Sequence, residues 1–284
     1  MKQFHSITYF LLLQCKTFLS TISNRSRHRL SSFISSLLYN HLKIRKELAK
    51  NNLKKAFPDW SDKKLKSILK KNYLFFAQNF IDFICIPKSW ERIKIDVIGE
   101  EILTSSLSKG NGVIMLSGHF GCWDVLGKWL SENSPLFTGV AQRQKNKGAD
   151  QFAKEQREIP GTKHIFRKEP IKKMYDVLSK NGILGLISDQ DARSKGVFVK
   201  FFNTFASTPK GAAIFHIKTL APMILGVCIK KSFQHYEIKF LPIDTSKKDI
   251  TFITQQYTDL LEKNIRKYPE QYFWFHRRWK TQPS

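Results

Sequence analysis

The stretch GVIMLSGHFGCWDVLGKWL, residues 112–130, places His119 and Asp124 just after an apolar run. An imidazole can take the proton of an alcohol as that alcohol attacks a carbonyl, a step that an unassisted hydroxyl performs poorly near neutral pH. A carboxylate beside the ring fixes its tautomer and stabilises the imidazolium that forms. His119 and Asp124 are therefore candidate catalytic residues. From these residues alone, a turn histidine followed by a solvated acid explains the pattern equally well.

The pair is not accompanied by an obvious nucleophile of the protein itself. SGHFG differs from the G-x-S-x-G turn that presents a reactive serine, so the attacking hydroxyl would belong to a substrate. Cys122 is an alternative nucleophile, although a cysteine at the start of a helix is more often a small packing residue.

Alternating strands and helices must position the pair. We expect strands at 112–117, 136–141, 182–188, 197–202, 222–229 and 235–241, and helices at 122–132, 149–158, 168–180, 208–220 and 250–267. This alternation predicts an α/β fold with a mixed, largely parallel central sheet flanked by helices. Ligands bind at the carboxyl ends of strands in such sheets, and His119 follows the first strand directly.

A second polar cluster follows the strand expected at 182–188. Arg193 or Lys195 could hold a phosphate, because the guanidinium fork matches phosphate geometry, and Asp189 could equally be a structural acid that pairs with this arginine. Farther on, Thr208 and Pro209 are typical of a helix N-cap followed by a first helical position.

The N-terminal quarter of the chain is helical and basic in character. Residues 1–58 contain eleven lysines or arginines against one acid. Between Lys2 and Lys16 only thirteen residues are free of charge, whereas a membrane span needs about 20 apolar residues. Residues 1–24 are therefore expected to be either a marginal membrane anchor or an interfacial helix, with a buried N-terminal helix as the alternative.

The rest of the chain, residues 25–284, is expected to form one domain. Its helical lead-in covers 25–90, where two helices break at Pro58 and Ser61 caps the second, and the α/β core covers 91–284.

Composition limits the function classes. Four scattered cysteines without a CxxC pair favour neither a zinc site nor a disulfide framework. The net charge of +25 suits nucleic acid, an anionic membrane or an acidic protein. FWFHRRWK, residues 273–280, could stack on single-stranded nucleic acid, but beside a membrane element we favour a membrane interface or a packed, phosphate-facing segment. No helix-turn-helix, zinc or RNP-type signature supports nucleic-acid binding.

Five blocks in order give the chain its resemblance to one family. It resembles the bacterial lipid A biosynthesis late acyltransferases, the lauroyl and myristoyl transferases, which share the H-x4-D/E motif of the glycerolipid acyltransferase superfamily. The blocks are residues 45–68, 117–124 (SGHFGCWD), 141–146 (AQRQKN), 187–213 and 272–281.

The resemblance implies a glycerolipid-acyltransferase-like fold and a reaction. A fatty acyl chain would pass from acyl carrier protein to a hydroxyl of a 3-hydroxyacyl chain on a lipid A precursor. The catalytic domain would lie on the cytoplasmic face of the inner membrane, with no metal or other cofactor and with an anionic membrane surface as a partner. Nucleic acid is not an expected partner.

The resemblance also implies roles for single residues. His119 would be the general base, and Asp124 would orient it. Arg143 would stabilise the oxyanion unless it is a solvated loop arginine, and free N–H groups at the helix start are further candidates. Arg143 and Asn146 match the second block, although the proline usual there is absent. With Asp189 and Arg193, they complete the expected substrate-binding set.

Three alternatives stay open. An acyl-CoA-dependent acyltransferase acting on another glycolipid, of the phosphatidylinositol mannoside type, would use the same His119 and Asp124. A thioesterase would replace the alcohol by water. A basic nucleic-acid-binding protein would owe its affinity to charge alone and would be indifferent to His119.

Overall fold

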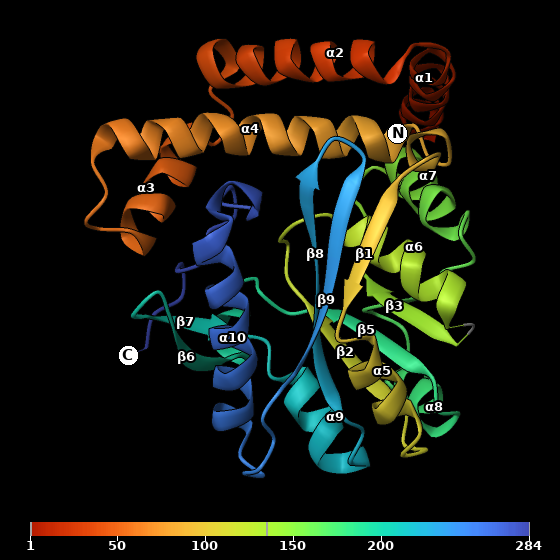
Figure 1. Cartoon of the computed structure of the whole chain (residues 1–284), viewed down its shortest axis with the longest axis vertical. Helices are drawn as coiled ribbons and strands as arrows, with labels where there is room; N and C mark the ends of the chain where they lie inside the picture. The colour runs from red at the N-terminus through yellow and green to blue at the C-terminus, as the bar shows by residue number, and fades with distance from the viewer. Residues whose placement is uncertain (1, 135, 284) are drawn as a thin grey trace.

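The computed structural model describes residues 2–134 and 136–283, with side chains from Ser6 onward. Met1, the first residue of the expected membrane element, lies outside the described residues. Helices cover a central sheet on both faces, and a layer of long helices crosses one end of it (Figure 1). The expected α/β fold is therefore confirmed.

The central sheet has seven strands in the order β1-β9-β8-β2-β5-β3-β4. All neighbouring strands run parallel except β8 and β9, so the sheet is mixed and largely parallel, as expected. The strands are β1 (Lys94–Ile98), β2 (Val113–Ser117), β3 (Phe137–Ala141), β4 (Lys163–Phe166), β5 (Ile183–Ile187), β8 (Met223–Ser232) and β9 (His235–Pro242).

Strand β2 shows why both faces of the sheet are covered. Ile114 and Leu116 pack into one hydrophobic cluster, together with side chains of α8, α9 and α10, whereas Val113 and Met115 pack into another, with α5 and α6. Successive strand residues point to opposite faces, so a strand that is apolar throughout is buried on both sides. The helices are α5 (Glu100–Leu107), α6 (Trp123–Asn133), α7 (Lys147–Glu158), α8 (Lys172–Ser179), α9 (Gly211–Thr219) and α10 (Ile250–Lys267).

The strand expected at 197–202 exists, but outside the main sheet. It is β6 (Val197–Phe201), which forms a separate antiparallel hairpin with β7 (Thr204–Thr208). Thr208 is therefore the last residue of a strand, and the prediction that it caps a helix is wrong. Its hydroxyl accepts a hydrogen bond from the buried Arg278, and α9 begins only at Gly211.

The crossing layer contains α1 (Lys2–Thr21), α2 (Asn24–Leu37), a short π-helix (Leu38–Leu42), α3 (Lys46–Ala56) and α4 (Asp62–Ile84). The expected break at Pro58 separates α3 from α4, and the Ser61 hydroxyl accepts a hydrogen bond from the Lys64 N–H, which confirms the N-cap. Single-turn helices occur at Lys88–Trp90, Arg193–Lys195 and Pro269–Gln271.

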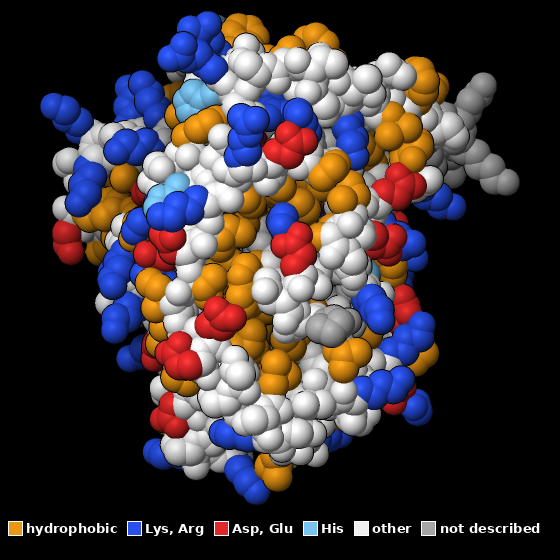
Figure 2. Space-filling view, turned by 45° about the vertical axis from the view of Figure 1, so that its right-hand side comes forward, with side chains coloured by type: hydrophobic (Ala, Val, Ile, Leu, Met, Phe, Trp, Pro, Cys, Tyr) orange, Lys and Arg blue, Asp and Glu red, His pale blue; other side chains and the backbone are white. Residues whose placement is uncertain are grey.

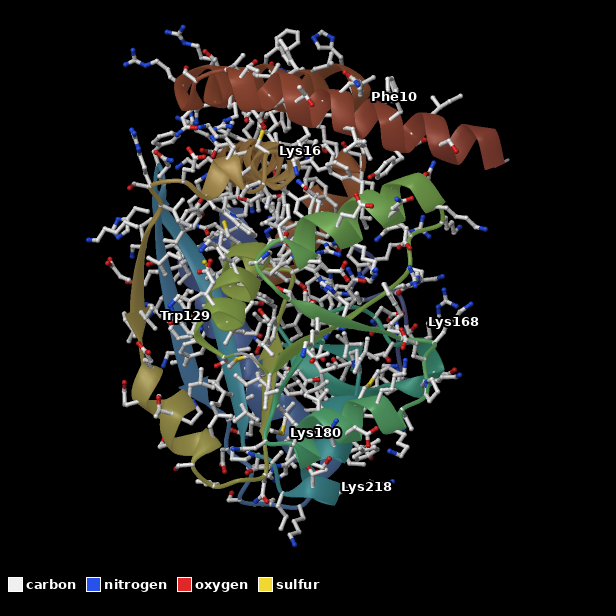
Figure 3. The ribbon with its side chains drawn as sticks, turned by 90° about the vertical axis from the view of Figure 1, so that its right-hand side faces the viewer. Phe10, Lys16, Trp129, Lys168, Lys180 and Lys218 are labelled. Carbon is white, nitrogen blue, oxygen red and sulfur yellow. The ribbon has the colours of Figure 1, made fainter. Side chains whose placement is uncertain are left out.

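Helix α1 has two unlike faces. Toward the protein, Tyr9 donates to Glu155 at 2.7 Å and Lys16 donates to Gln156 at 2.6 Å, both on α7. Away from the protein, Phe10 is 58% exposed and lies on the outer side of the helix in Figure 3, opposite Lys16. Within residues 2–134 and 136–283, no helix combines the length and apolar character needed to cross a bilayer.

Candidate active site

The turn that carries His119 is fixed by backbone contacts from two other segments. Gly121 has a φ of +66°, and a Cβ at this position would lie 1.9 Å from the Cys228 carbonyl oxygen, so glycine is required there. The Gly121 N–H donates to the Gln271 carbonyl at 2.9 Å, and the His119 carbonyl accepts from the Phe273 N–H at 2.9 Å. Because β8 and the C-terminal segment both hold it, the turn presents the imidazole in one orientation.

The carboxylate beside His119 belongs to Asp189. His119 Nδ1 lies 2.7 Å from Asp189 Oδ1. Asp189 comes two residues after β5, which pairs in parallel with β2, so the two side chains meet where neighbouring strands end. The Asp189 side chain is only 3% exposed, whereas that of His119 is 28% exposed.

This pairing changes how both groups titrate. Burial alone would lower the pKa of His119, but the charge and hydrogen bond of Asp189 outweigh it, so that the pKa lies above its ordinary value. Burial likewise opposes ionisation of Asp189, yet contact with His119 holds the pKa of this carboxyl below its usual range. With Nδ1–H donated to Asp189, neutral His119 presents Nε2 as a proton acceptor.

Asp124 does not orient the ring, contrary to expectation. It lies in the first turn of α6 and accepts from Arg157 Nε of α7 at 3.1 Å. In the part of the chain that the structure describes, it shares no hydrogen bond with His119, although its charge helps to raise the pKa of the imidazole. Because α6 begins at Trp123, the aspartate faces α7, and the acid of the neighbouring strand reaches Nδ1 instead.

Tyr272 and Gln190 contact the pair and were not anticipated. Tyr272 is buried; burial, together with the charge of the nearby Asp189 carboxylate, raises the tyrosine pKa well above its ordinary value. Gln190 Nε2 lies 3.4 Å from His119 Nε2. The sequence singled out the segment of Tyr272 for its aromatic and basic composition, which gave no sign of contact with Asp189.

An aromatic wall lies beside His119. The ring of Trp123 stands edge-on to the imidazole with centroids 5.4 Å apart, and that of Phe273 lies 6.2 Å away. Phe76 of α4 packs against both of these rings. The proton-accepting histidine is therefore bordered by apolar surface supplied by three separate segments.

A small surface hollow lies next to the Asp124–Arg157 ion pair. It is lined by residues that include Gln142, Gln144, Lys154, Arg157, His164 and Phe166. His164 Nδ1 is buried without a hydrogen-bond partner within residues 2–134 and 136–283. Burial, the largest influence, lowers the pKa of His164, which favours the neutral ring.

Arg143 and Asn146 stand in the loop between β3 and α7. Arg143 is exposed, pairs with Asp150 at 2.9 Å and lies over the Phe166 ring. Asn146 caps α7 by accepting from the Ala149 N–H and donates to the Thr8 hydroxyl of α1 at 3.0 Å. Asn146 thus links α1 to the start of α7.

Arg193 lies apart from Asp189. It is exposed and has a φ of +56°, and its guanidinium has no hydrogen-bond or ion-pair partner in the described ranges. Asp191 instead holds the C-terminal end by accepting from the Thr281 N–H and hydroxyl. The alternative in which Asp189 pairs with Arg193 is wrong, because Asp189 faces inward to His119.

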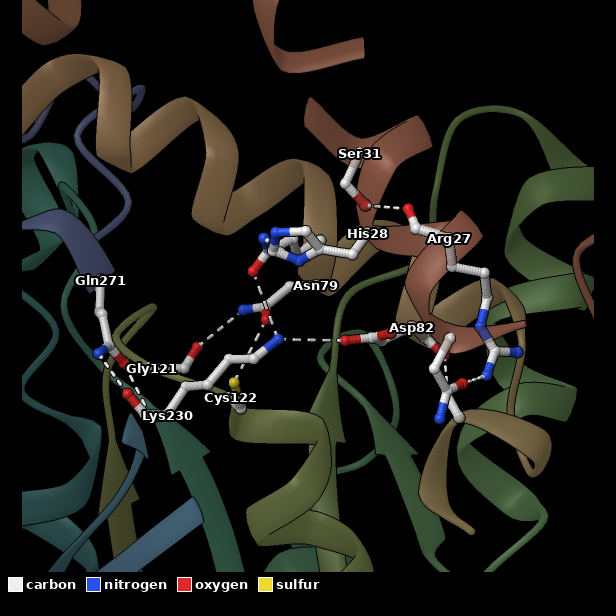
Figure 4. A network of polar contacts seen from close by, with 12 residues as sticks. Arg27, His28, Ser31, Asn79, Asp82, Gly121, Cys122, Lys230 and Gln271 are labelled. Atoms are coloured by element: carbon white, nitrogen blue, oxygen red, sulfur yellow. Dashed lines mark hydrogen bonds and ion pairs between the residues drawn. The ribbon is translucent and has the colours of Figure 1, made fainter. Parts of the chain in front are cut away.

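Cys122 lies in a polar network behind the turn (Figure 4). Its thiol donates to Asn79 Oδ1 at 3.3 Å, and burial raises the pKa of the thiol to about 12. Since the thiolate is the nucleophilic form, this environment argues against Cys122 as a nucleophile. Lys230, in the same network, contacts Asp82 and Gln78.

Comparison with known proteins identifies relatives that are named as acyltransferases. A family model described as bacterial lipid A biosynthesis acyltransferase matches residues 2–281. The phosphatidylinositol mannoside acyltransferase of Mycolicibacterium smegmatis is 30% identical over 191 residues, which are 66% of this chain and 62% of that protein. The chain therefore spans less than two thirds of the length of this mycobacterial relative.

Two proteins of Escherichia coli are similar over more of the chain. The lipid A biosynthesis palmitoleoyltransferase is 23% identical over 261 residues, 89% of this chain and 85% of that protein. The lipid A biosynthesis lauroyltransferase is 24% identical over 271 residues, 90% of this chain and 86% of that protein.

Proposed function

The chain belongs to the bacterial lipid A biosynthesis acyltransferase family, and on this premise we propose that it transfers a fatty acyl chain from a thioester donor to a hydroxyl of a glycolipid. The more specific proposal has acyl carrier protein as the donor and a 3-hydroxyacyl chain of a lipid A precursor as the acceptor. Similarity to lipid A acyltransferases over about nine tenths of the chain supports this acceptor.

The observation that carries the proposal is the His119–Asp189 pair, with Nε2 beside an aromatic wall and 3.4 Å from Gln190 Nε2. His119 Nε2 takes the proton of the acceptor hydroxyl as its oxygen attacks the thioester carbonyl. Asp189 stabilises the imidazolium. The carbon–sulfur bond then breaks, the ester forms, and the imidazolium returns its proton to the departing thiolate. This sequence needs no metal, and the thioester is the only co-substrate.

The tetrahedral oxyanion needs preorganised hydrogen-bond donors. Intrahelical hydrogen bonds of α6 begin with the Val125 and Leu126 N–H groups, which leaves those of Trp123 and Asp124 at the helix start. Arg157 supplies a positive charge near His119. The Arg143 side chain is 57% exposed, whereas the charge of Arg157 acts on His119, so we assign the oxyanion to the start of α6 and to Arg157 rather than to Arg143.

The acceptor is proposed to place its polar part near the hollow of Arg157 and His164, and its acyl chains along the aromatic wall. We further propose that the outer face of α1 lies on the cytoplasmic side of the inner membrane. Its exposed apolar residues and the basic residues Arg25 and Arg29 at the start of α2 suit an anionic lipid surface.

The decisive experiment incubates purified protein in non-ionic detergent with a panel of acyl carrier protein thioesters and a tetraacylated lipid A precursor. Mass spectrometry should detect the gain of one acyl chain by the wild type. His119→Ala should lower the rate by about 10²–10⁴-fold, the range that loss of general-base catalysis typically costs. No gain of an acyl chain by the precursor would refute the specific acceptor.

A second candidate acceptor is a phosphatidylinositol mannoside with acyl-CoA as donor, favoured by the 30% identity to the mycobacterial enzyme. The same assay with these two substrates separates the candidates, because both would depend on His119. Activity on this pair alone would make the second candidate the function.

A further inference from the structure

Helix α3 and the first half of α4 form the most strongly basic surface of the chain. Residues 43–71 hold eleven lysines or arginines against three acids, and so supply eight of the net charge of +25. We define the α3–α4 lysine face by six exposed side chains: Lys50, Lys54, Lys55, Lys63, Lys66 and Lys70. None of these six forms an ion pair with any residue that the structure describes.

Three helices elsewhere in the molecule each pair a lysine with an acid one turn away. Lys128 pairs with Glu132, Lys154 with Glu158 and Lys172 with Asp176, each four residues apart. The α3–α4 lysine face instead places lysines at four-residue spacing, at 50 and 54 and at 66 and 70. Like charges at this spacing repel each other and destabilise a helix.

Figure 2 shows the same contrast across the surface. Blue side chains dominate the left-hand edge, while blue and red alternate along the right-hand edge. The α3–α4 lysine face is therefore not an ordinary solvated helix surface, in which opposite charges offset one another.

This face adjoins the segment that flanks His119. The buried Asn52 of α3 donates to the carbonyls of Trp274 and His276. The ring of Tyr73 in α4 packs edge-on against Phe275, at 4.8 Å between centroids. Two residues before Phe275, the Phe273 N–H donates to the His119 carbonyl. A partner held on this face would therefore sit beside the aromatic wall of the candidate active site.

The face carries few side chains that could enter a bilayer. Within residues 43–71 the structure describes one exposed large hydrophobic residue, Ile44, whereas α1 and α2 expose Phe10, Phe18 and Phe33. Interfacial helices bind membranes through apolar side chains as well as charge. Charge without apolar contact suits a soluble anionic protein, which is steered to the site quickly and released easily.

We propose that the α3–α4 lysine face docks an acidic carrier protein and so delivers its thioester to His119. This inference rests on the proposed function, because it requires a protein-bound acyl donor. It assigns the donor to α3 and α4, and leaves the outer face of α1 to the membrane.

The test compares two double charge reversals in non-ionic detergent. Lys50→Glu with Lys66→Glu changes the face, and Lys180→Glu with Lys218→Glu makes the same charge change at the end of the molecule opposite α1 (Figure 3). Lys180 and Lys218 are exposed and also unpaired among the described residues. The donors are acyl carrier protein and acyl-pantetheine, which has the same thioester without net charge.

For the first variant we expect the KM for the acyl carrier protein to rise about tenfold with kcat unchanged. Neutralisation by Lys50→Gln with Lys66→Gln should raise it about threefold. The KM for acyl-pantetheine should stay at the wild-type value, which also shows that the variant is folded. The control variant should keep both wild-type KM values.

Four results would overturn the proposal. Equal KM values for carrier protein in the face and control variants would refute the docking site but would leave the proposed function standing. A parallel rise in the KM for acyl-pantetheine would place the effect in the active site. Loss of sedimentation with anionic vesicles, with an unchanged KM for carrier protein, would make the face a membrane contact. A wild type that accepts acyl-CoA but no carrier protein would refute the proposed donor and, with it, this surface.

Discussion

At the scale of single residues, the proposed chemistry depends on which acid faces the imidazole. Asp189 is almost fully buried and contacts Nδ1, while Asp124 is more exposed and is held by Arg157. Both carboxylates raise the pKa of His119, but only Asp189 can fix its tautomer through a hydrogen bond. Substitution of Asp189 should therefore change the tautomer and the pKa of His119, whereas substitution of Asp124 should act through Arg157.

Asp189→Asn should lower kcat by on the order of 10³–10⁴-fold, since an amide neither stabilises the imidazolium nor enforces the tautomer. The acid limb of kcat/KM should also move to lower pH. Neutral His119 is the active form, so activity is lost as the pH falls through its pKa, and the Asp189 charge holds that pKa above its ordinary value. A pH–rate profile measures both effects.

Asp191→Asn is the matched control, because Asp191 bonds to Thr281 rather than to His119. It should leave the acid limb in place. An acid limb that stays put in Asp189→Asn as well would mean that this carboxylate does not tune the base.

Asp124 and Arg157 should act as one unit. Their ion pair places a cation near His119, and removal of either partner leaves the other without its counter-charge. In a double-mutant cycle on kcat, Asp124→Ala combined with Arg157→Ala should be no slower than the slower single variant. Additive losses in the logarithm of kcat would show that the two residues work independently.

His119 could be recognised as a candidate from local sequence, whereas its partner could not. His119 lies directly after an apolar strand and ahead of a helix pattern, which local spacing reveals. Asp189 is 70 residues away and meets His119 only because β5 lies beside β2 in the sheet. The motif spacing drew attention to Asp124 instead, which the start of α6 turns toward Arg157.

At the scale of elements, the junction of α1, α4 and α7 depends on a buried amide. Gln156 of α7 is 2% exposed, donates to the carbonyls of Phe83 and Ile84 at the end of α4, and accepts from Lys16 of α1. Gln156 thus satisfies the Ile84 carbonyl at the end of α4 and adds a donor to the Phe83 carbonyl, which also accepts from the Ile86 N–H. Lys16, which interrupts the apolar run of the N-terminus, is explained by this contact.

Gln156→Ala should lower the free energy of unfolding by about 2–3 kcal/mol, because it removes the donor of the buried Ile84 carbonyl and the acceptor of Lys16. Chemical denaturation in detergent measures the loss. Gln151→Ala is the control, since this exposed residue of the same helix donates a hydrogen bond to Glu155 on the helix surface. Equal stability of the two variants would show that the junction does not depend on the buried amide.

Elements with a strong pattern were predictable, and short or sparsely apolar ones were not. The apolar run of β2 indicated a buried strand, and the helical spacing of apolar residues along α10 (Ile250–Lys267) indicated a long helix. Strand β4 has only four residues, which is too short for an alternation of polar and apolar residues to be recognised in the sequence. Thr208-Pro209 followed the N-cap pattern, but pairing within the β6–β7 hairpin took precedence.

At the scale of the whole molecule, the order of the strands in the sheet is the feature that the sequence does not predict. An alternation of strands and helices predicts a layered α/β protein, but it does not state that β9 runs antiparallel to β8 or that β5 lies between β2 and β3. Those neighbours are set by long-range packing. His119 therefore lies at the strand ends, as expected, but its hydrogen-bond partner is Asp189 rather than Asp124.

The whole-molecule prediction concerns how the protein meets the membrane. Ile7, Phe10, Leu11 and Phe18 are each more than half exposed on one side of α1, while Tyr9 and Lys16 hold its other side against α7. Phe10→Ser with Phe18→Ser should reduce sedimentation with anionic vesicles by about tenfold or more, since each ring removed from the interface forfeits on the order of 1.5–3 kcal/mol. Turnover in detergent should persist, because the inner contacts of α1 are untouched. The matched control is Phe205→Ser, an exposed aromatic on the β6–β7 hairpin. Vesicle binding that survives in the α1 variant would move the membrane contact to another surface.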